Sequence, residues 1–193
     1  MHKIVGKPRL VGMAGSLRRS SYSSAVLSGL RENLLPAAQI ETCDLRLPLY
    51  NEDEDGPAAP EEVRTFREAI WASDGVVIVT PEYNHGIPGV LKNALDWASR
   101  PFGESALIDK PVLVISVSPA FTGGVRAQAQ VNETLLAIGA GIVTGPQVVI
   151  GSITGKIQDG LLVDGESLRF ALGALDRLIA MSRNDRTSQR LLA

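Results

Sequence analysis

The stretch VVIVTPEYNHGIPGVLKNALDW, residues 76–97, joins a buried strand to a polar turn and then to a helix. Its first four residues are apolar and β-branched, which favours a strand, and the run stops at the polar segment 80–86. Pro88 then favours the start of a helix, because proline lacks the N–H that the first helical turn leaves unpaired. Ligands of open α/β sheets bind at the carboxyl ends of strands. The turn carries a carboxylate, an aromatic ring and an amide, so the sequence predicts a ligand site there.

Short apolar runs alternate with helical patterns along the rest of the chain. The runs lack polar alternation, which is typical of strands buried on both faces. A helix between successive strands indicates a parallel sheet with right-handed crossovers. The sequence therefore predicts a three-layer α/β sandwich with a five-stranded parallel sheet. The predicted strands are 9–14, 40–43, 75–80, 112–118 and 142–150. One predicted helix ends before Pro36, a second begins near Pro60, a third spans 88–98, and two more cover 127–138 and 168–179.

Length, charge and composition limit the class of protein. A chain of 193 residues with 45% hydrophobic residues suits one domain over residues 1–193. A net charge of −2 gives no electrostatic footprint for nucleic acid or an anionic membrane. The chain has neither the roughly 18 consecutive apolar residues of a membrane span nor an apolar signal-peptide core, and its single cysteine, Cys43, cannot form an internal disulfide. A cytoplasmic protein without membrane insertion is expected, and two histidines with one cysteine predict no metal site.

Two segments are long for loops of a compact domain. Residues 44–59 carry four consecutive acids at 52–55, and loops of this length are often lids or contact surfaces. A solvated acidic loop is an equal interpretation. Residues 151–165 are expected to form a small hairpin before the last helix.

A second polar turn, GMAGSLRRSSYSS at residues 12–24, follows the first predicted strand and precedes a helix. Backbone N–H groups and the helix dipole favour an anion at such a position, and the serine hydroxyls and arginines add donors and charge. The glycine spacing matches neither the G-x-G-x-x-G fingerprint nor a Walker loop, so a Rossmann-type dinucleotide and a nucleoside triphosphate are disfavoured. The alternative is that the serines only cap the helix and the arginines are solvated.

Two motifs together carry a resemblance to a known family. The segments GSLRRSSYSSAV (15–26) and TPEYNHGIPGVLKNALDWASRP (80–101) resemble those of the NADPH-dependent FMN reductase family, which includes quinone, chromate and azo-dye reductases. The resemblance covers roughly residues 8–182. It implies a flavodoxin-like fold with strand order 2-1-3-4-5, one non-covalent FMN per subunit, and a homodimer or homotetramer with the flavin near the interface.

The resemblance also assigns the parts of the flavin site. Three residues are expected at the FMN phosphate, four around the isoalloxazine ring, and one in a third turn. Ser23 stands where the family often has asparagine, and the role of His85 is open. For Glu82, an ion pair with a partner subunit is an equal interpretation. The expected cofactor-binding residues are Ser16, Arg18 and Ser23 at the phosphate, Pro81, Glu82, Tyr83 and Asn84 at the ring, and Ser118.

The predicted activity follows from the cofactor. NADPH or NADH delivers hydride to flavin N5, which passes it to quinones, free flavin, chromate or azo compounds, and no protein acid or base is required. One alternative is a flavodoxin-like electron carrier without direct NAD(P)H turnover, although such carriers are usually strongly acidic. Another is a flavin-free structural subunit. A low-molecular-weight phosphatase is excluded, because it needs an arginine six positions after its cysteine and Leu49 stands there.

Overall fold

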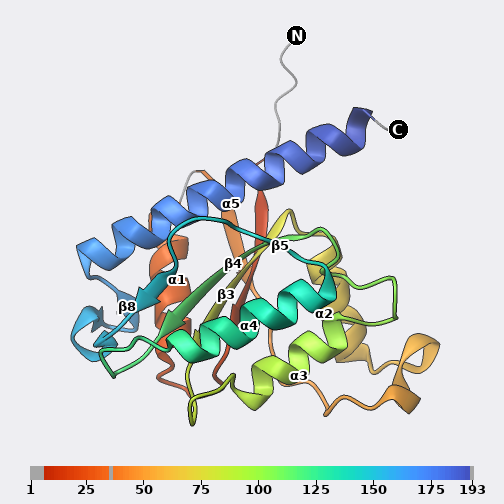
Figure 1. The fold of residues 1–193 in the computed structure, drawn as a ribbon, viewed down its shortest axis with the longest axis horizontal. Coiled ribbons are helices and arrows are strands. Elements are labelled where there is room, and N and C mark those ends of the chain that lie inside the picture. The colour runs from red at the N-terminus through yellow and green to blue at the C-terminus, as the bar shows by residue number, and fades with distance from the viewer. Residues whose placement is uncertain (1–6, 35–36, 192–193) are drawn as a thin grey trace.

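A parallel β-sheet forms the middle layer of the molecule (Figure 1). The computed structural model describes residues 7–34 and 37–191, with side chains up to residue 183. The sheet order is β2-β1-β3-β4-β5, and β6 also pairs with β4. This confirms the predicted order 2-1-3-4-5. The strands are β1 (Arg9–Ala14), β2 (Gln39–Thr42), β3 (Gly75–Pro81), β4 (Pro111–Val117), β5 (Gly141–Ile142) and β6 (Val148–Ile150).

Helices cover both faces of this sheet, as the sequence predicts. Helices α1 and α5 pack with one hydrophobic cluster of the sheet, and α2, α3 and α4 pack with the other (Figure 1). The bounds are α1 (Tyr22–Leu34), α2 (Glu61–Trp71), α3 (Gly89–Ala98), α4 (Val125–Ile138) and α5 (Gly165–Leu191).

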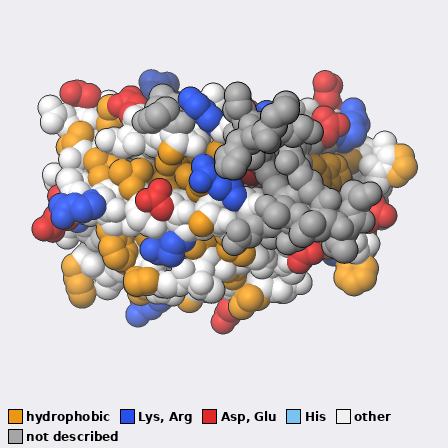
Figure 2. Space-filling model, turned by 90° about the horizontal axis from the view of Figure 1, so that it is seen from above, with side chains coloured by type: hydrophobic (Ala, Val, Ile, Leu, Met, Phe, Trp, Pro, Cys, Tyr) orange, Lys and Arg blue, Asp and Glu red, His pale blue; other side chains and the backbone are white. Residues whose placement is uncertain are grey.

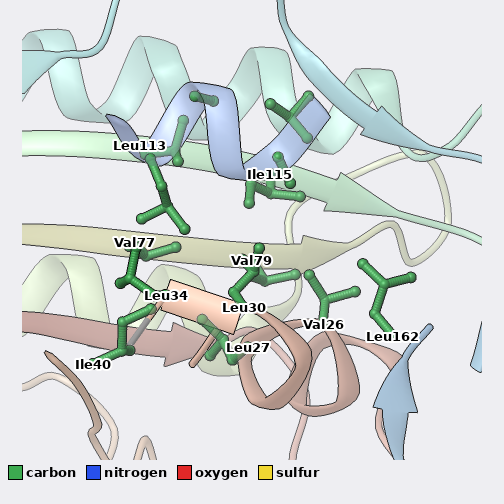
Figure 3. Packing of buried hydrophobic residues seen from close by; sticks show 14 of the residues in the cluster. Val26, Leu27, Leu30, Leu34, Ile40, Val77, Val79, Leu113, Ile115 and Leu162 are labelled. Carbon is green, nitrogen blue, oxygen red and sulfur yellow. The ribbon is translucent and has the colours of Figure 1, made fainter. Parts of the chain in front are cut away.

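The core under α1 shows how sequence spacing becomes packing. Val26, Leu30 and Leu34 recur at helical spacing, so one stripe of α1 faces the sheet. Figure 3 shows this stripe facing Val77 and Val79 of β3. Each side chain of this size contributes roughly 1.5–3 kcal/mol when it is fully buried, and this burial fixes α1 over the strands whose ends form the site.

The predicted strand 142–150 is wrong in its middle, where the structure has two short strands instead of one. Strand β5 pairs with the start of β4 and β6 pairs with its end. Between them Gly145 has φ +123° and Pro146 has no N–H to give to a ladder. The side-chain amide of Gln128 fills the gap, donating to the carbonyls of Val114 (3.0 Å) and Val148 (3.3 Å).

Both long loops have defined structure. The segment 151–165 contains the expected hairpin, β7 (Ile157–Gln158) and β8 (Leu161–Leu162), joined by an Asp-Gly pair that suits a two-residue turn. In the acidic loop, Asp55 pairs with the buried guanidinium of Arg67 at 2.7 Å. Pro48 O accepts bonds from Asn93 Nδ2 (2.9 Å) and Trp97 Nε1 (2.8 Å) of α3. The loop is therefore anchored on α2 and α3, while the acids at 52–54 remain exposed.

Surface charge is mixed on the face seen in Figure 2. Outside the grey region, acidic and basic side chains alternate among hydrophobic ones, with no large area of a single sign. Within the described part of the chain, no helix is both long and apolar enough to cross a bilayer. Nor do three or more His, Cys, Asp or Glu side chains gather there in an arrangement that could hold a metal ion.

Candidate functional site

The two polar turns meet at the carboxyl ends of β1 and β3. These strands are neighbours, with Ala14 opposite Val79. Gly15 continues the contact, because its N–H donates to Val79 O at 2.8 Å. A Cβ at this position would lie 3.0 Å from the Pro81 ring, a tight contact, so the close approach of the turns favours glycine. Across the same gap the hydroxyls of Ser16 and Tyr83 share a hydrogen bond of 2.9 Å.

A cleft of about 350 Å³ opens where these turns meet. Six of the eight predicted residues line it, which means that the structure brings the expected phosphate and ring residues together. Its walls also include Val117 and Pro119 of the turn after β4, on either side of Ser118. Asn84 and Ser118 are not among the lining residues. The full lining is Ser16, Arg18, Ser21, Tyr22, Ser23, Pro81, Glu82, Tyr83, Val117 and Pro119.

The serines of the first turn have different roles. Ser21 Oγ accepts from the N–H of Ser24 at 3.3 Å and so caps α1, as the alternative interpretation held for all of them. Ser23 is different: it is only 1% exposed, and its hydroxyl has no hydrogen-bond partner among the residues that the structure describes. A buried hydroxyl without a partner costs roughly 1–3 kcal/mol. Its position in the cleft wall, in the first turn of α1, fits a phosphate oxygen as the missing acceptor.

Arg18 provides positive charge beside Ser23. Its guanidinium lies 4.9 Å from the centre of the Tyr22 ring and forms no ion pair with any described side chain. The hydrogen bond from Thr154, followed by contributions from Arg18, lowers the pKa of the Tyr22 hydroxyl despite an opposing desolvation effect. An orphaned hydroxyl, an unpaired cation and a helix N-terminus thus converge, and this arrangement fits the phosphate of FMN.

The ring side of the cleft is a tight turn. Tyr83 and Gly86 exchange two backbone hydrogen bonds, of 3.1 and 3.0 Å, and the residues between them, Asn84 and His85, both have positive φ, as in a type I′ turn. Gln130 of α4 holds the end of the turn by accepting from the N–H of Ile87 at 2.9 Å. Asn84 therefore lies at the tip of a braced turn, and the turn presents half of the Tyr83 side chain to solvent.

Glu82 has a role that neither interpretation of the sequence foresaw. Its Oε2 accepts from the backbone N–H groups of Arg126 (3.0 Å) and Ala127 (3.3 Å), at the start of α4. The residue before α4 is Gly124, which has no side chain to cap the helix. Glu82 supplies this cap from another element, and its Oε1 lies 3.4 Å from His85 Nδ1, which also contacts the Arg126 guanidinium.

Ser118 and three α4 residues complete the surroundings. Ser118 Oγ accepts from the N–H of Ala120 at 3.1 Å, so this hydroxyl shapes its own turn. The α4 residues Arg126, Gln128 and Gln130 were not predicted, because each contacts a segment more than ten residues away and no local pattern marks it. Tyr22, in contrast, belongs to the quoted serine-rich turn, and its position beside Arg18 could have been proposed from that turn.

Fold and cleft together define a mononucleotide-binding protein of the flavodoxin-like class. A model of the NADPH-dependent FMN reductase family matches residues 8–155, and the chain belongs to this family. A quinone reductase of Pseudomonas putida is 38% identical over 177 residues, which cover 90% of this chain and 94% of the relative. An NAD(P)H-dependent FMN reductase of Pseudomonas aeruginosa is 38% identical over 161 residues, covering 82% of this chain and 86% of the relative.

A solved structure agrees with these matches. FerB, a flavoenzyme NAD(P)H:(acceptor) oxidoreductase from Paracoccus denitrificans, superposes with a TM-score of 0.83 at 31% identity, covering 92% of this chain and 98% of the other. The chain is accordingly a flavin-dependent NAD(P)H oxidoreductase with FMN as cofactor. A carrier without NAD(P)H turnover is not favoured.

Proposed function

We propose that this protein transfers hydride from NADPH or NADH, by way of FMN, to quinones and to other small acceptors such as free flavin, chromate and azo compounds. The quinone reductases among its relatives support this acceptor class. The observation that carries the proposal is the cleft in which the unpartnered Ser23 hydroxyl and Arg18 lie opposite the Tyr83 turn. Bound FMN would supply the redox chemistry, since its N5 accepts and releases hydride.

The side chains are assigned to binding and positioning, and none to acid–base catalysis. Ser16, Arg18 and Ser23 hold the phosphate, with Ser23 donating its free hydroxyl and Arg18 neutralising charge. Pro81, Tyr83 and Asn84 form the ring side, and Ser118 keeps the turn after β4 in shape. Glu82 acts as a positioning residue, because it fixes the ring-side turn to α4.

We further propose that residues 1–193 work as one domain, in a cytoplasmic homodimer or homotetramer. Every described α-helix packs on the parallel sheet, which supports a single domain. Exposed aromatic side chains support assembly: Phe121, two residues after Pro119 of the cleft wall, is 88% exposed, and Tyr83 of the cleft wall is 50% exposed. Exposed aromatic groups of this kind are typical of interfaces.

Steady-state kinetics with both nucleotides test this function. The protein is reconstituted with FMN and assayed with NADPH and with NADH against a panel of menadione, benzoquinone, ferricyanide, chromate and an azo dye. We expect FMN-dependent nucleotide consumption with parallel-line, ping-pong kinetics and quinones among the better acceptors. Nucleotide consumption no faster than in the protein-free control, for every acceptor, would overturn the proposal.

A further inference from the structure

A cationic hollow adjoins the FMN cleft on the β2 side. It measures about 370 Å³ and shares two wall residues, Ser16 and Arg18, with the cleft. Arg19 and Arg46 add two further cations to its wall. Because Arg18 belongs to both hollows, a group that extends sideways from the FMN phosphate would enter this one first.

A second hollow continues in the same direction, toward α2. It measures about 690 Å³, within the roughly 300–1,000 Å³ of small-molecule sites, and Thr42, Asp44 and Arg46 are among the residues that it shares with the first. Its opposite wall is α2, with Glu61, Glu62, Thr65, Phe66 and Ala69. We call the two hollows together the lateral groove. It lies over the carboxyl ends of β1 and β2, the edge of the sheet where ligands bind.

The chemistry of the lateral groove changes along its length. The end near the cleft is basic: Arg18 and Arg19 form no ion pair within the described residues, and Asp44 is already occupied by Arg46 at 3.0 Å. Burial and the charge of Glu41 raise the pKa of the Cys43 thiol to about 11, so it adds no negative charge at neutral pH. The far end is lined by Phe66, which is only 3% exposed, by the half-buried Ala69 and by the exposed carboxylates of Glu61 and Glu62.

We propose that the lateral groove binds the adenosine monophosphate half of FAD, so that the flavin site accepts FAD as well as FMN. The inference rests on the proposed function, because it places the flavin phosphate at Ser16, Arg18 and Ser23. In FAD a second phosphate is bonded directly to that phosphate, which brings it toward Arg18 and Arg19. The ribose and adenine then follow toward α2, where the carboxylates of Glu61 and Glu62 can accept from hydroxyl and amino groups. The arginines would bind the pyrophosphate, which a glycine-rich fingerprint binds in Rossmann folds.

Comparing the two flavins isolates the groove, because only FAD carries a second phosphate and an adenosine that can extend past Arg18 into it. Flavin-free protein is titrated with FMN and with FAD by isothermal calorimetry, as wild type, as the double variant Arg19→Gln/Arg46→Gln, and as Arg31→Gln. Arg31 lies in the last turn of α1, away from the groove, and controls for lost charge. We expect the double variant to lose roughly tenfold or more in FAD affinity with FMN affinity within about twofold, and Arg31→Gln to change neither.

The outcomes separate the groove from the proposed function. If FMN binds and FAD does not, the proposal for the lateral groove is wrong, while the proposed function stands. The same holds if FAD binds equally well to the wild type and to the double variant. Failure of both flavins to bind would overturn the proposed function. Protein loaded with FMN is also titrated with ADP and with adenosine 2′,5′-bisphosphate. Binding of either nucleotide that depends on Arg19 and Arg46, in protein that rejects FAD, would assign the groove to the nicotinamide nucleotide and contradict our proposal.

Discussion

At the scale of the residue, Ser23 lines the cleft with a buried hydroxyl that has no partner in the described part of the chain. Ser23→Ala should therefore have two opposite effects. The flavin-free protein loses an unsatisfied group, so its stability should be equal or higher. Bound FMN loses a charge-assisted hydrogen bond of about 1.5–3 kcal/mol, so the Kd for FMN should rise at least tenfold. Thermal unfolding of the flavin-free protein and flavin fluorescence titration measure the two effects. Ser28→Ala, further along α1, is the matched control, and a Ser23→Ala variant with unchanged FMN affinity would exclude Ser23 from the phosphate site.

Arg18 should contribute mainly its charge to the same site, and its bidentate geometry to a smaller extent. Arg18→Ala is expected to weaken FMN binding, and Arg18→Lys to restore part of it, because lysine keeps the charge but not the bidentate geometry. The difference between wild type and Arg18→Ala should shrink as salt is raised, since Arg18 is exposed and its field is screened. Titrations at low and high ionic strength test this expectation, with Arg31→Ala as the control. Equal FMN affinity in wild type and Arg18→Ala would refute the phosphate assignment.

At the scale of the element, Glu82 joins the ring-side turn to α4 through two backbone N–H groups. Loss of an N-cap acceptor costs about 0.5–2 kcal/mol, so Glu82→Ala should lower the free energy of unfolding by this amount. Glu82→Gln should lower it less, because the amide oxygen still accepts. Urea denaturation measures both variants, and Glu133→Gln, an exposed position on α4, is the control. A Glu82→Ala variant as stable as wild type would remove the capping role.

The anchor of the acidic loop should give the protein a component of acid sensitivity. Desolvation raises the pKa of Asp55, but the hydrogen bond from Arg67, the backbone N–H of Gly56 and the nearby arginine charges outweigh it and lower that pKa overall. A lowered pKa in the folded state adds stability that is complete above the unfolded value of about 3.9 and is lost as pH falls below it. The free energy of unfolding, measured by denaturation at several pH values between neutral pH and pH 3, should therefore fall more steeply for wild type than for Asp55→Asn. Parallel curves would contradict this.

Helices and strands could be predicted where adjacent residues signal them, and less well where they depend on contacts between residues that are distant in the sequence. The strand before Thr80 and the helix after Pro88 can be identified from a few adjacent residues, and the alternation of such units implies the parallel sheet. The break in the fifth strand has a local signal in Gly145 and Pro146, but the Gln128 amide that fills the gap comes from a preceding helix and could not be predicted. Glu82 was selected as a site residue, yet its bond to α4 spans 44 residues and depends on tertiary packing.

At the scale of the whole molecule, the same limit applies to the surroundings of the site. The phosphate-side residues Ser16, Arg18 and Ser23 lie within a few positions of one another, so they could be grouped from the sequence alone. The lateral groove could not be found in this way, because its walls come from the first turn, the end of β2 and α2. The arginines of the groove line the same surface only because the sheet places β2 beside β1.

The proposed assembly is a property of the whole molecule that the exposed rings make testable. Phe121, two residues after Pro119 of the cleft wall, is 88% exposed, and a two-fold interface that contains it would bury it twice. Burial of each ring contributes roughly 1.5–3 kcal/mol, so Phe121→Ser should weaken association by two orders of magnitude or more. Light scattering after size exclusion should give two or four times the chain mass of 20.5 kDa for wild type, and a smaller species for the variant at low concentration. Phe170→Ser, at a half-exposed ring on α5, is the matched control. A wild-type protein that elutes at 20.5 kDa at every concentration would exclude the dimer and the tetramer.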